Sequence, residues 1–409
     1  MSLVTDLFLQ YAAIDTQSIS GTANFPSTQT QLAFAARLAA DCRALGLTEV
    51  LLFPEGYVTA VLPANTAEAR PIVGFLAHMD TSPDFSGAGV KPVLHADYDG
   101  SDIHLHGARI LSPKQFPALN GCIGKTLITA GGTTLLGADD KAGIAEILAA
   151  MDVLLRDETL KHGEIRIAFT PDEEIGHGVD KFDVKRFGAD FAYTVDGGAL
   201  GELEYESFHA ARALLTVTGN SVHPGYAKGI MVNAAQIMAE IAAALPAAER
   251  PETTEGREGY FHLVKSHGNV ERATADIILR DFTREGMNRR KDFILDVTQA
   301  LNSTYGSQTV TLNLYDEYFN MAEVLEARPH ITALAARAMR DCGIEPIIRP
   351  IRGGTDGSRL SFMGLPCPNL FTGGHNAHGP YEFIAVEDME KAVETIVRIA
   401  TAACETARI

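Results

Sequence analysis

Side chains that can bind divalent metal ions occur in five short segments of this chain. They supply two histidines and several carboxylates, and the segments are His78-Met79-Asp80, Asp139-Asp140, Glu173-Glu174, Asp196 and His378. Imidazole nitrogens and carboxylate oxygens together form a ligand set that suits zinc. We therefore expect the chemistry of a two-zinc hydrolase if the fold brings the five segments together.

Two of the segments have a spacing that suits a metal site without requiring one. In an extended chain His78 and Asp80 project from the same side, so the carboxylate can accept the proton of the second imidazole nitrogen and orient the ring. Asp139 and Asp140 precede a segment in which apolar residues have helical spacing. Either aspartate could only cap that helix, or one could bridge two cations.

The remaining segments also allow more than one interpretation. In the pair Glu173-Glu174 the adjacent side chains point in different directions, so one can bind a metal ion while the other holds a water molecule. Asp196 precedes two glycines and could mark only a turn. The last ligand position stays open, because His375 and His177 compete with His378 for it.

Apolar runs that precede three of the segments give the strongest reason to expect that they converge. The runs cover residues 72–76, 165–169 and 191–195, and they are typical of strands covered on both faces. Metal-type residues follow each run within a few positions. In open α/β sheets ligands bind beyond the carboxyl ends of the strands, so residues far apart in the sequence can meet there.

The chain of 409 residues is long enough for two domains. Residues 1–207 alternate amphipathic helices with short apolar strands, which predicts an α/β catalytic domain. Residues 208–319 change to the β-α-β-β-α-β order of a ferredoxin-like α+β unit. The α/β pattern resumes over residues 320–409, so we expect the middle segment to be an insertion in the catalytic domain.

Charge and composition exclude several classes of partner. A net charge of −18 repels nucleic acid and anionic membrane surfaces. No apolar stretch is long enough to cross a bilayer, and Met1–Gln10 lacks the pattern of a signal peptide. The five cysteines have no paired or metal-type spacing, which favours reduced thiols. We expect a cytoplasmic protein that binds neither nucleic acid nor membrane.

Six motifs distributed over nearly the whole chain resemble the M20 metallopeptidase family, and within it the tripeptide aminopeptidases. They include both domains, and they are Ala77-His78-Met79-Asp80-Thr81, Gly137-Ala138-Asp139-Asp140-Lys141-Ala142-Gly143, Thr170-Pro171-Asp172-Glu173-Glu174, Thr194-Val195-Asp196-Gly197-Gly198, Val222-His223-Pro224-Gly225 and Arg352-Gly353-Gly354-Thr355-Asp356-Gly357. The family usually has an aromatic residue before the final histidine, where this chain has Ala377.

This resemblance implies a particular distribution of ligands between two zinc ions per subunit. His78 and Asp196 would hold one ion, Glu174 and His378 would hold the other, and Asp140 would bridge both. The peptide bond after the bridging aspartate would be cis.

The resemblance also implies which residues take part in catalysis. Asp80 would orient His78, and Glu173 would be the general base that activates water and then the acid that protonates the departing amine. The cis bond expected after the bridging residue is therefore Asp140-Lys141.

Candidate substrate contacts come from the insertion and from a later loop. His223 resembles the histidine that the family places near the oxyanion, although its spacing fits an ordinary turn residue equally well. Arg352 offers a planar donor fork beside Gly353 and Gly354, where backbone can approach a ligand. Arg280 is a second candidate, and the alternative for it is a solvated arginine on an exposed strand face.

Together these expectations describe a cytosolic zinc aminopeptidase that acts on tripeptides and forms a homodimer through the insertion, which would also serve as a lid. A dipeptidase or an N-acyl-amino-acid deacylase would keep the same ligands and differ in the substrate pocket. A two-metal phosphoesterase would use similar carboxylates, but the loops around the ligands hold few cations for a phosphate. A scaffold without activity is disfavoured because Glu173 and all the ligand candidates are present.

Overall fold

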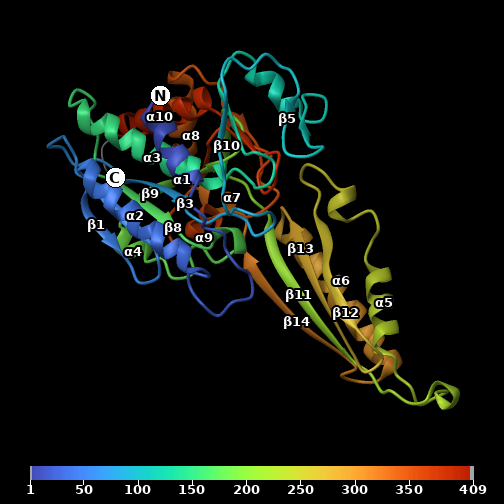
Figure 1. Cartoon of the computed structure of the whole chain (residues 1–409). Coiled ribbons are helices and arrows are strands. Elements are labelled where there is room, and N and C mark those ends of the chain that lie inside the picture. The colour runs from blue at the N-terminus through green and yellow to red at the C-terminus, as the bar shows by residue number, and fades with distance from the viewer. Residues whose placement is uncertain (1, 406–409) are drawn as a thin grey trace. The chain divides into compact units, whose positions relative to one another are not determined.

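The computed structural model describes residues 2–405, which divide into two compact units (Figure 1). The first unit runs to Tyr205 and resumes over Glu323–Arg349 and from Thr355 onward. The second unit comprises Glu206–Ala322 together with Pro350–Gly354. The loop at 350–354 thus belongs to the second unit, although the sequence pattern places it in the resumed catalytic domain.

The first unit is built on a mixed sheet, whose strand order is β1-β2-β8-β3-β9-β16-β10-β15. Its strands are β1 (Thr48–Leu52), β2 (Val58–Leu62), β3 (Val73–His78), β8 (Ile165–Thr170), β9 (Phe191–Gly197), β10 (Glu202–Glu204), β15 (Ile347–Ile348) and β16 (Asn369–Phe371). The central strands β8, β3, β9 and β16 run parallel. Every residue of β3 is buried, as expected for a strand covered on both faces.

Helices cover both faces of this sheet (Figure 1). One apolar core joins the sheet to α1 (Leu3–Ala12), α2 (Gln29–Leu45), α3 (Ala138–Arg156), α8 (Pro329–Asp341) and α10 (Val386–Ala403). A second core lies on the opposite face, with α4 (Val184–Phe187) and α9 (Asp356–Phe362). Helix α2 ends at Gly46, whose φ of +100° is readily adopted only by glycine.

Smaller elements complete the first unit. A second sheet has the order β17-β18-β7-β4, and β5 pairs with β6. Their bounds are β4 (Val93–His95), β5 (Ile103–His104), β6 (Ile110–Leu111), β7 (Leu127–Thr129), β17 (Gly374–His375) and β18 (Phe383–Ala385). A short helix, α7 (Ala322–Leu325), lies where the chain passes from the second unit back to the first.

The second unit has the β-α-β-β-α-β order expected of a ferredoxin-like unit. Its elements are β11 (His209–Thr218), α5 (Ala234–Ala244), β12 (Tyr260–Gly268), β13 (Arg272–Asp281), α6 (Arg284–Tyr305) and β14 (Val310–Tyr318). The sheet is antiparallel with the order β12-β13-β11-β14. Alternate residues of β13 are buried, because one face of the sheet packs against α5 and α6.

None of the helices in residues 2–405 combines the length and the apolar character needed to cross a bilayer.

Candidate metal centre

The predicted ligand segments meet at one edge of the large sheet of the first unit. His78 is the last residue of β3, Asp196 lies at the end of β9, and the pair Glu173-Glu174 follows β8 within a few residues. In the parallel register His78 is opposite Thr170, so the carboxyl ends of these strands lie together. Asp139 and Asp140 join them from the start of α3, and His378 joins them from the loop after β17.

His78 forms the buried side of the centre. Its side chain is 2% exposed, and its Nε2 atom lies 2.8 Å from Oδ1 of Asp139 and 3.3 Å from Oδ1 of Asp196. An imidazole that faces two carboxylate oxygens in this way is arranged as one half of a cation site.

His378 forms the second half, on the more exposed side. Its Nε2 atom lies 2.9 Å from Oε2 of Glu174 and 3.2 Å from Oδ2 of Asp139. Asp139 therefore presents one oxygen to His78 and the other to His378. A carboxylate that is shared between two imidazoles is suited to bridge two cations.

Asp140 is oriented differently from Asp139. It is fully buried, and its Oδ2 accepts the backbone N–H of His78 at 3.0 Å. Its Oδ1 has no hydrogen-bond partner, although Asp140, His78 and Asp196 do bring one possible ligand atom each into a common group. A cis peptide bond lies between Asp139 and Asp140, and among the described residues there is none at Asp140-Lys141, so the prediction of a cis bond there was wrong. Sequence spacing offers no means of ranking two adjacent aspartates.

Asp80 contacts the second nitrogen of His78 and also holds the glutamate loop. Nδ1 of His78 lies 3.1 Å from the Asp80 carbonyl oxygen and 3.4 Å from Oδ1 of its carboxylate. The two carboxylate oxygens accept the backbone N–H groups of Glu173 and Glu174 at 3.0 and 3.2 Å. One buried carboxylate thus fixes both a ligand ring and the loop that carries the candidate base.

The glutamate loop has a second support that the sequence analysis missed. Asp172 has a φ of +55°, and its carboxylate accepts hydrogen bonds from the backbone and hydroxyl of Ser27 and from the side chain of Gln31. The Gln31 amide oxygen accepts the backbone N–H of Asp172 in return. No local signal could have indicated this contact, because Ser27 lies 145 residues away in the chain.

The crowding of acidic groups changes the protonation of the centre. Burial raises the pKa of Glu174 to about 8 and that of Asp196 to about 6, and the charge of Asp139 adds to both shifts. Burial also raises the pKa of Glu173, assisted by the charges of Asp196 and Asp356. A buried group of carboxylates is stable only with protons or cations to compensate its charge.

The donor set fits a pair of divalent cations. Mixed nitrogen and oxygen ligands suit zinc, and buried Oδ1 of Asp140 and Oε1 of Glu174 have no hydrogen-bond partner. The His78 imidazole and the carboxylates of Asp139 and Glu174 bring ligand atoms within 4.8 Å of one another, which is close enough to hold one ion.

The two alternative histidines have other contacts. The ring of His375 stacks on that of Phe383 with centroids 4.7 Å apart, and burial lowers its pKa to about 4. His177 is exposed, and its Nδ1 lies 2.7 Å from Asp180. His378 is therefore the candidate that the structure brings to Asp139 and Glu174.

The residues predicted to contact substrate all lie in the second unit. The Arg352 guanidinium donates to the carbonyl groups of Thr254, Gly256 and Glu258, so its planar fork already holds a loop within that unit. Arg280 donates to Glu317 at 3.1 Å. The sequence could not reveal these partners, because they come from other segments of the insertion.

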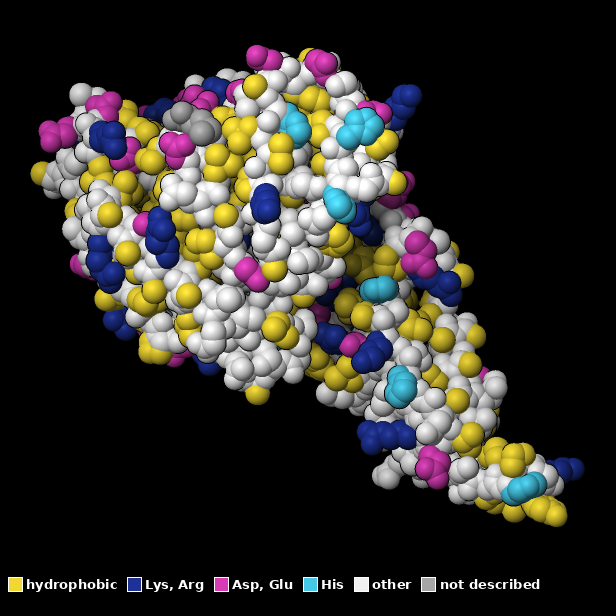
Figure 2. Space-filling model, viewed as in Figure 1, with side chains coloured by type: hydrophobic (Ala, Val, Ile, Leu, Met, Phe, Trp, Pro, Cys, Tyr) yellow, Lys and Arg dark blue, Asp and Glu magenta, His cyan; other side chains and the backbone are white. Residues whose placement is uncertain are grey.

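Gly353, Gly354 and His223, the other three candidates for substrate contact, have fewer polar partners than Arg352 and Arg280. A Cβ atom on Gly354 would lie 2.5 Å from the Tyr318 ring, whereas one on Gly353 would meet only Cγ2 of Ile351 at 3.9 Å. His223 is exposed, and its Nδ1 accepts the N–H of Gly225. Its segment lies between β11 and α5, at an end of the second unit where Figure 2 shows hydrophobic side chains gathered.

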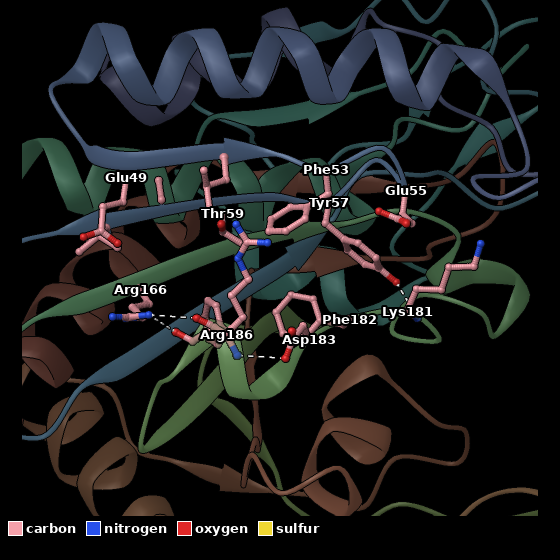
Figure 3. A pocket seen from close by; sticks show the side chains of 14 residues that line it. Glu49, Phe53, Glu55, Tyr57, Thr59, Arg166, Lys181, Phe182, Asp183 and Arg186 are labelled. Atoms are coloured by element: carbon pink, nitrogen blue, oxygen red, sulfur yellow. Dashed lines mark hydrogen bonds between the residues drawn. The ribbon is translucent and has the colours of Figure 1, made fainter.

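Two cavities of similar size lie in the first unit, and they differ in chemistry. One of about 230 Å³ adjoins the metal centre and is lined by Asp139, Asp140, Asp196, Asn376 and Glu382, among others. The other, of about 250 Å³, lies between β1, β2 and α4 (Figure 3). Its lining combines aromatic rings with Arg166, Lys181 and Arg186, and it includes no histidine. The first cavity has carboxylates of the candidate metal centre in its wall, whereas the carboxylates of the second, Glu49, Glu55 and Asp183, lie beside these basic side chains.

Comparisons with known proteins agree with this geometry. The model of peptidase family M20/M25/M40 matches residues 136–402. A Peptidase T from Caldanaerobacter subterraneus subsp. tengcongensis is 55% identical over 401 residues, which is 98% of each chain. The crystal structure of aminopeptidase PepT from Bacillus cereus has the same fold, with a TM-score of 0.76 at 22% identity over 98% of each chain. A Bacillus subtilis M20 protein described as a dinuclear metal binding peptidase gives a TM-score of 0.66 at 14% identity, again over 98% of each chain.

The fold and the clustered ligands define a metal-dependent hydrolase built on an α/β sheet. The chain belongs to peptidase family M20/M25/M40. The predicted resemblance to M20 metallopeptidases, the predicted fold and the prediction of a metallo-aminopeptidase are thereby confirmed.

Proposed function

We propose that the protein is a di-zinc aminopeptidase that releases the N-terminal residue of tripeptides. The observation that carries this proposal is the arrangement of two histidines around Asp139. Each histidine faces one oxygen of that carboxylate, and each has a further carboxylate of its own: Asp196 for His78 and Glu174 for His378.

The same observation changes one residue in the ligand set expected from the sequence. His78 and Asp196 would hold one zinc ion, Glu174 and His378 would hold the other, and Asp139 would bridge them in place of Asp140. Asp140 would instead support the centre from beneath, because its Oδ2 is committed to the His78 backbone.

When bound, the two ions would polarise the scissile carbonyl and make a water molecule acidic enough to attack at neutral pH. Glu173 would accept the proton of that water and return it to the departing amine. Support for this role comes from its place beside Glu174 and from Asp80, which holds the backbone of both residues. Within the described residues, Glu173 forms no ion pair with an arginine or lysine, so its carboxylate is available for proton transfer.

His223, Arg280, Arg352, Gly353 and Gly354 would contact the substrate or shape the loop that does. The bonds that Arg352 already makes favour a supporting role for it, since they leave its fork engaged.

We also propose a homodimer formed through the second unit and a cytoplasmic location. The second unit has two edge strands, β12 and β14, and exposes Leu214, Val264 and Tyr315, which are 37%, 46% and 41% exposed. The free thiols of the five cysteines support a reducing compartment. Sedimentation velocity of the purified chain tests the dimer, and a monomer at all concentrations would reject it.

The decisive experiment compares substrates and variants after removal of metal with a chelator and return of zinc. Amino acid release is measured from a free tripeptide, a dipeptide and an N-acetylated tripeptide, and phosphate release from an aryl phosphate. We expect zinc-dependent cleavage of the free tripeptide. Preference for the dipeptide or the blocked peptide would reject the tripeptidase, and phosphate release would indicate a phosphoesterase.

Two sets of variants test the assigned roles. Glu173→Gln should lower kcat by roughly 10²- to 10⁴-fold while leaving zinc stoichiometry unchanged, whereas exposed Glu158→Gln is the matched control. Asp139→Asn should remove bound zinc, measured by elemental analysis. If Asp140→Asn removed zinc and Asp139→Asn did not, the bridging role would return to Asp140.

A further inference from the structure

Glu382 is a buried carboxylate whose oxygens are both directed at a ligand loop. The residue is 1% exposed. Its Oε2 accepts the backbone N–H groups of Leu136 and Gly137 at 2.6 and 2.9 Å, and its Oε1 accepts that of Asp139 at 3.1 Å. Three hydrogen bonds thus join this side chain to the segment that carries the candidate bridging aspartate.

The loop needs such a partner because its backbone does not follow a regular helix. Gly137 has a φ of +80°, and Asp139 and Asp140 have non-helical backbone angles although α3 begins at Ala138. Leu136 and Ala138 are fully buried, so water cannot satisfy the N–H groups around them. A buried N–H group without an acceptor loses the hydrogen bond that it makes to water in the unfolded chain, and a carboxylate is a strong acceptor for several such groups at once.

Glu382 also belongs to the segment that supplies the other half of the centre. It lies four residues after His378, and its own backbone N–H donates to Gly379 at 3.3 Å. Asn376 closes the same turn by donating to the carbonyl of Tyr381 at 3.1 Å. The turn that carries His378 is therefore compact, and Glu382 fastens it to the loop of Asp139.

We propose that Glu382 is a positioning residue that sets the separation between Asp139 and His378 and so controls binding of the second zinc ion. Neither oxygen of Glu382 is left for the metal itself, since both accept backbone N–H groups. The first ion shares Asp139 with the second, but its other ligands, His78 and Asp196, are held by β3 and β9 rather than by the turn after β17. This inference rests on the proposed two-zinc function.

Replacement of Glu382 by glutamine tests the role of its three hydrogen bonds, with little change in side-chain volume. In Glu382→Gln one oxygen acceptor becomes an NH₂ donor, which would face a backbone N–H. We expect the affinity for the second zinc ion to fall by about 10- to 100-fold, with a smaller loss at the first site, which shares only Asp139 with the loosened segments. Zinc binding to metal-stripped protein is measured by competition with a chromophoric chelator, which does not depend on activity.

A second readout follows the loop directly. Hydrogen exchange should speed up at the amides of Leu136, Gly137 and Asp139 in Glu382→Gln, with or without zinc. Glu382→Asp keeps the charge but shortens the reach, and should show an intermediate loss of the second ion. The matched control is Glu204→Gln, a partly buried carboxylate of the first unit, which accepts a hydrogen bond from the side chain of Asn369.

A failure of the role of Glu382 and a failure of the two-zinc function would give different results. Equal weakening of both zinc sites in Glu382→Gln, or unchanged exchange at the three amides, would overturn the positioning role. The same losses in Glu204→Gln would show general destabilisation and would overturn it as well. Wild-type protein that binds fewer than two zinc ions would reject the two-zinc function, while the exchange measurement would still decide whether Glu382 holds the loop.

Discussion

Carboxylates in the second unit lie against basic side chains, whereas those at the metal centre of the first unit contact imidazoles and backbone N–H groups. In the second unit Asp276 lies 2.6 Å from Arg212, and Asp281 lies 3.1 Å from Arg290. Among the described residues, no arginine or lysine forms an ion pair with Asp139, whose partners are His78 and His378.

This difference fits the finding that, among the described residues, both groups of possible metal ligands lie in the first unit. A carboxylate paired with arginine already has its charge compensated, and a divalent ion would have to displace that partner. At the metal centre the buried acids are held in place by neutral donors such as the amides of Glu173 and Glu174, which fix their position without removing their charge. The scaffold of the first unit is thus arranged for an added cation.

Removal of metal should have the largest effect, and it should be confined to the first unit. A ligand present at a thousandfold excess over its Kd stabilises the folded state by about 4 kcal/mol. We expect chelation to accelerate hydrogen exchange in the segments 136–141, 171–176 and 374–379 and to leave strands β11–β14 unchanged. Hydrogen exchange with mass spectrometry measures both units in one sample. Equal acceleration in both units would contradict the contrast drawn between them.

Gly143→Ala should break the packing beneath the centre. A Cβ atom at this position would lie 1.9 Å from the carbonyl oxygen of Val195 and 2.5 Å from Oδ1 of Asp140. Overpacking of this kind costs about 1–3 kcal/mol or more, so we expect a clear fall in Tm together with weaker zinc binding. Gly121→Ala is the control, because nothing lies within 4 Å of the added atom. A Gly143→Ala protein that kept wild-type Tm and zinc affinity would show that the close contact is not needed.

The sequence predicted much of the scaffold, because each signal was local. Apolar runs indicated β3, β8 and β9, and the order of elements indicated the ferredoxin-like unit. Ligand segments could be assigned to the carboxyl edge of the sheet, since parallel strands that end together bring their following residues together.

The finer features of the site depend on contacts between distant segments. Adjacent Asp139 and Asp140 have the same chemistry, and only the turn before α3 decides which one faces both histidines. The hydrogen bonds that the Glu382 carboxylate accepts from that turn span more than 240 residues of chain. Asp172 and Arg352 likewise satisfy partners that no periodicity indicates.

Glu146 shows what burial does to a carboxyl group that has no hydrogen-bond partner and is not one of the candidate metal ligands. This residue of α3 is fully buried, and neither of its side-chain oxygens has a hydrogen-bond partner. Burial raises its pKa well above the ordinary value of about 4.3, and the charge of Asp388 adds to the shift. In the folded protein the group keeps its proton over a pH range in which the unfolded chain releases it. The free energy of unfolding therefore falls as the pH rises from the Glu146 pKa of the unfolded chain to the Glu146 pKa of the folded protein.

Glu146→Gln should remove this pH dependence. We expect the stability of the variant relative to wild type to increase between pH 4.5 and 8, by at most about 1.4 kcal/mol for each pH unit below the folded pKa. Thermal unfolding of both proteins across that range, with the zinc concentration held constant, provides the measurement. A difference in Tm that stayed constant with pH would mean that Glu146 ionises equally in both states.

Arg212→Met should have the smallest effect, because the ion pairs of the second unit are partly solvated. The Arg212 and Asp276 side chains are 34% and 22% exposed, and such pairs contribute about 1 kcal/mol or less. We expect a small fall in Tm that is reduced at high salt, and no change in either zinc affinity. A double-mutant cycle with Asp276→Asn isolates the pair from the lost packing of the arginine. If Arg212→Met changed zinc binding, charge compensation in the second unit would be coupled to the metal centre, and the two units could not be treated as electrostatically independent.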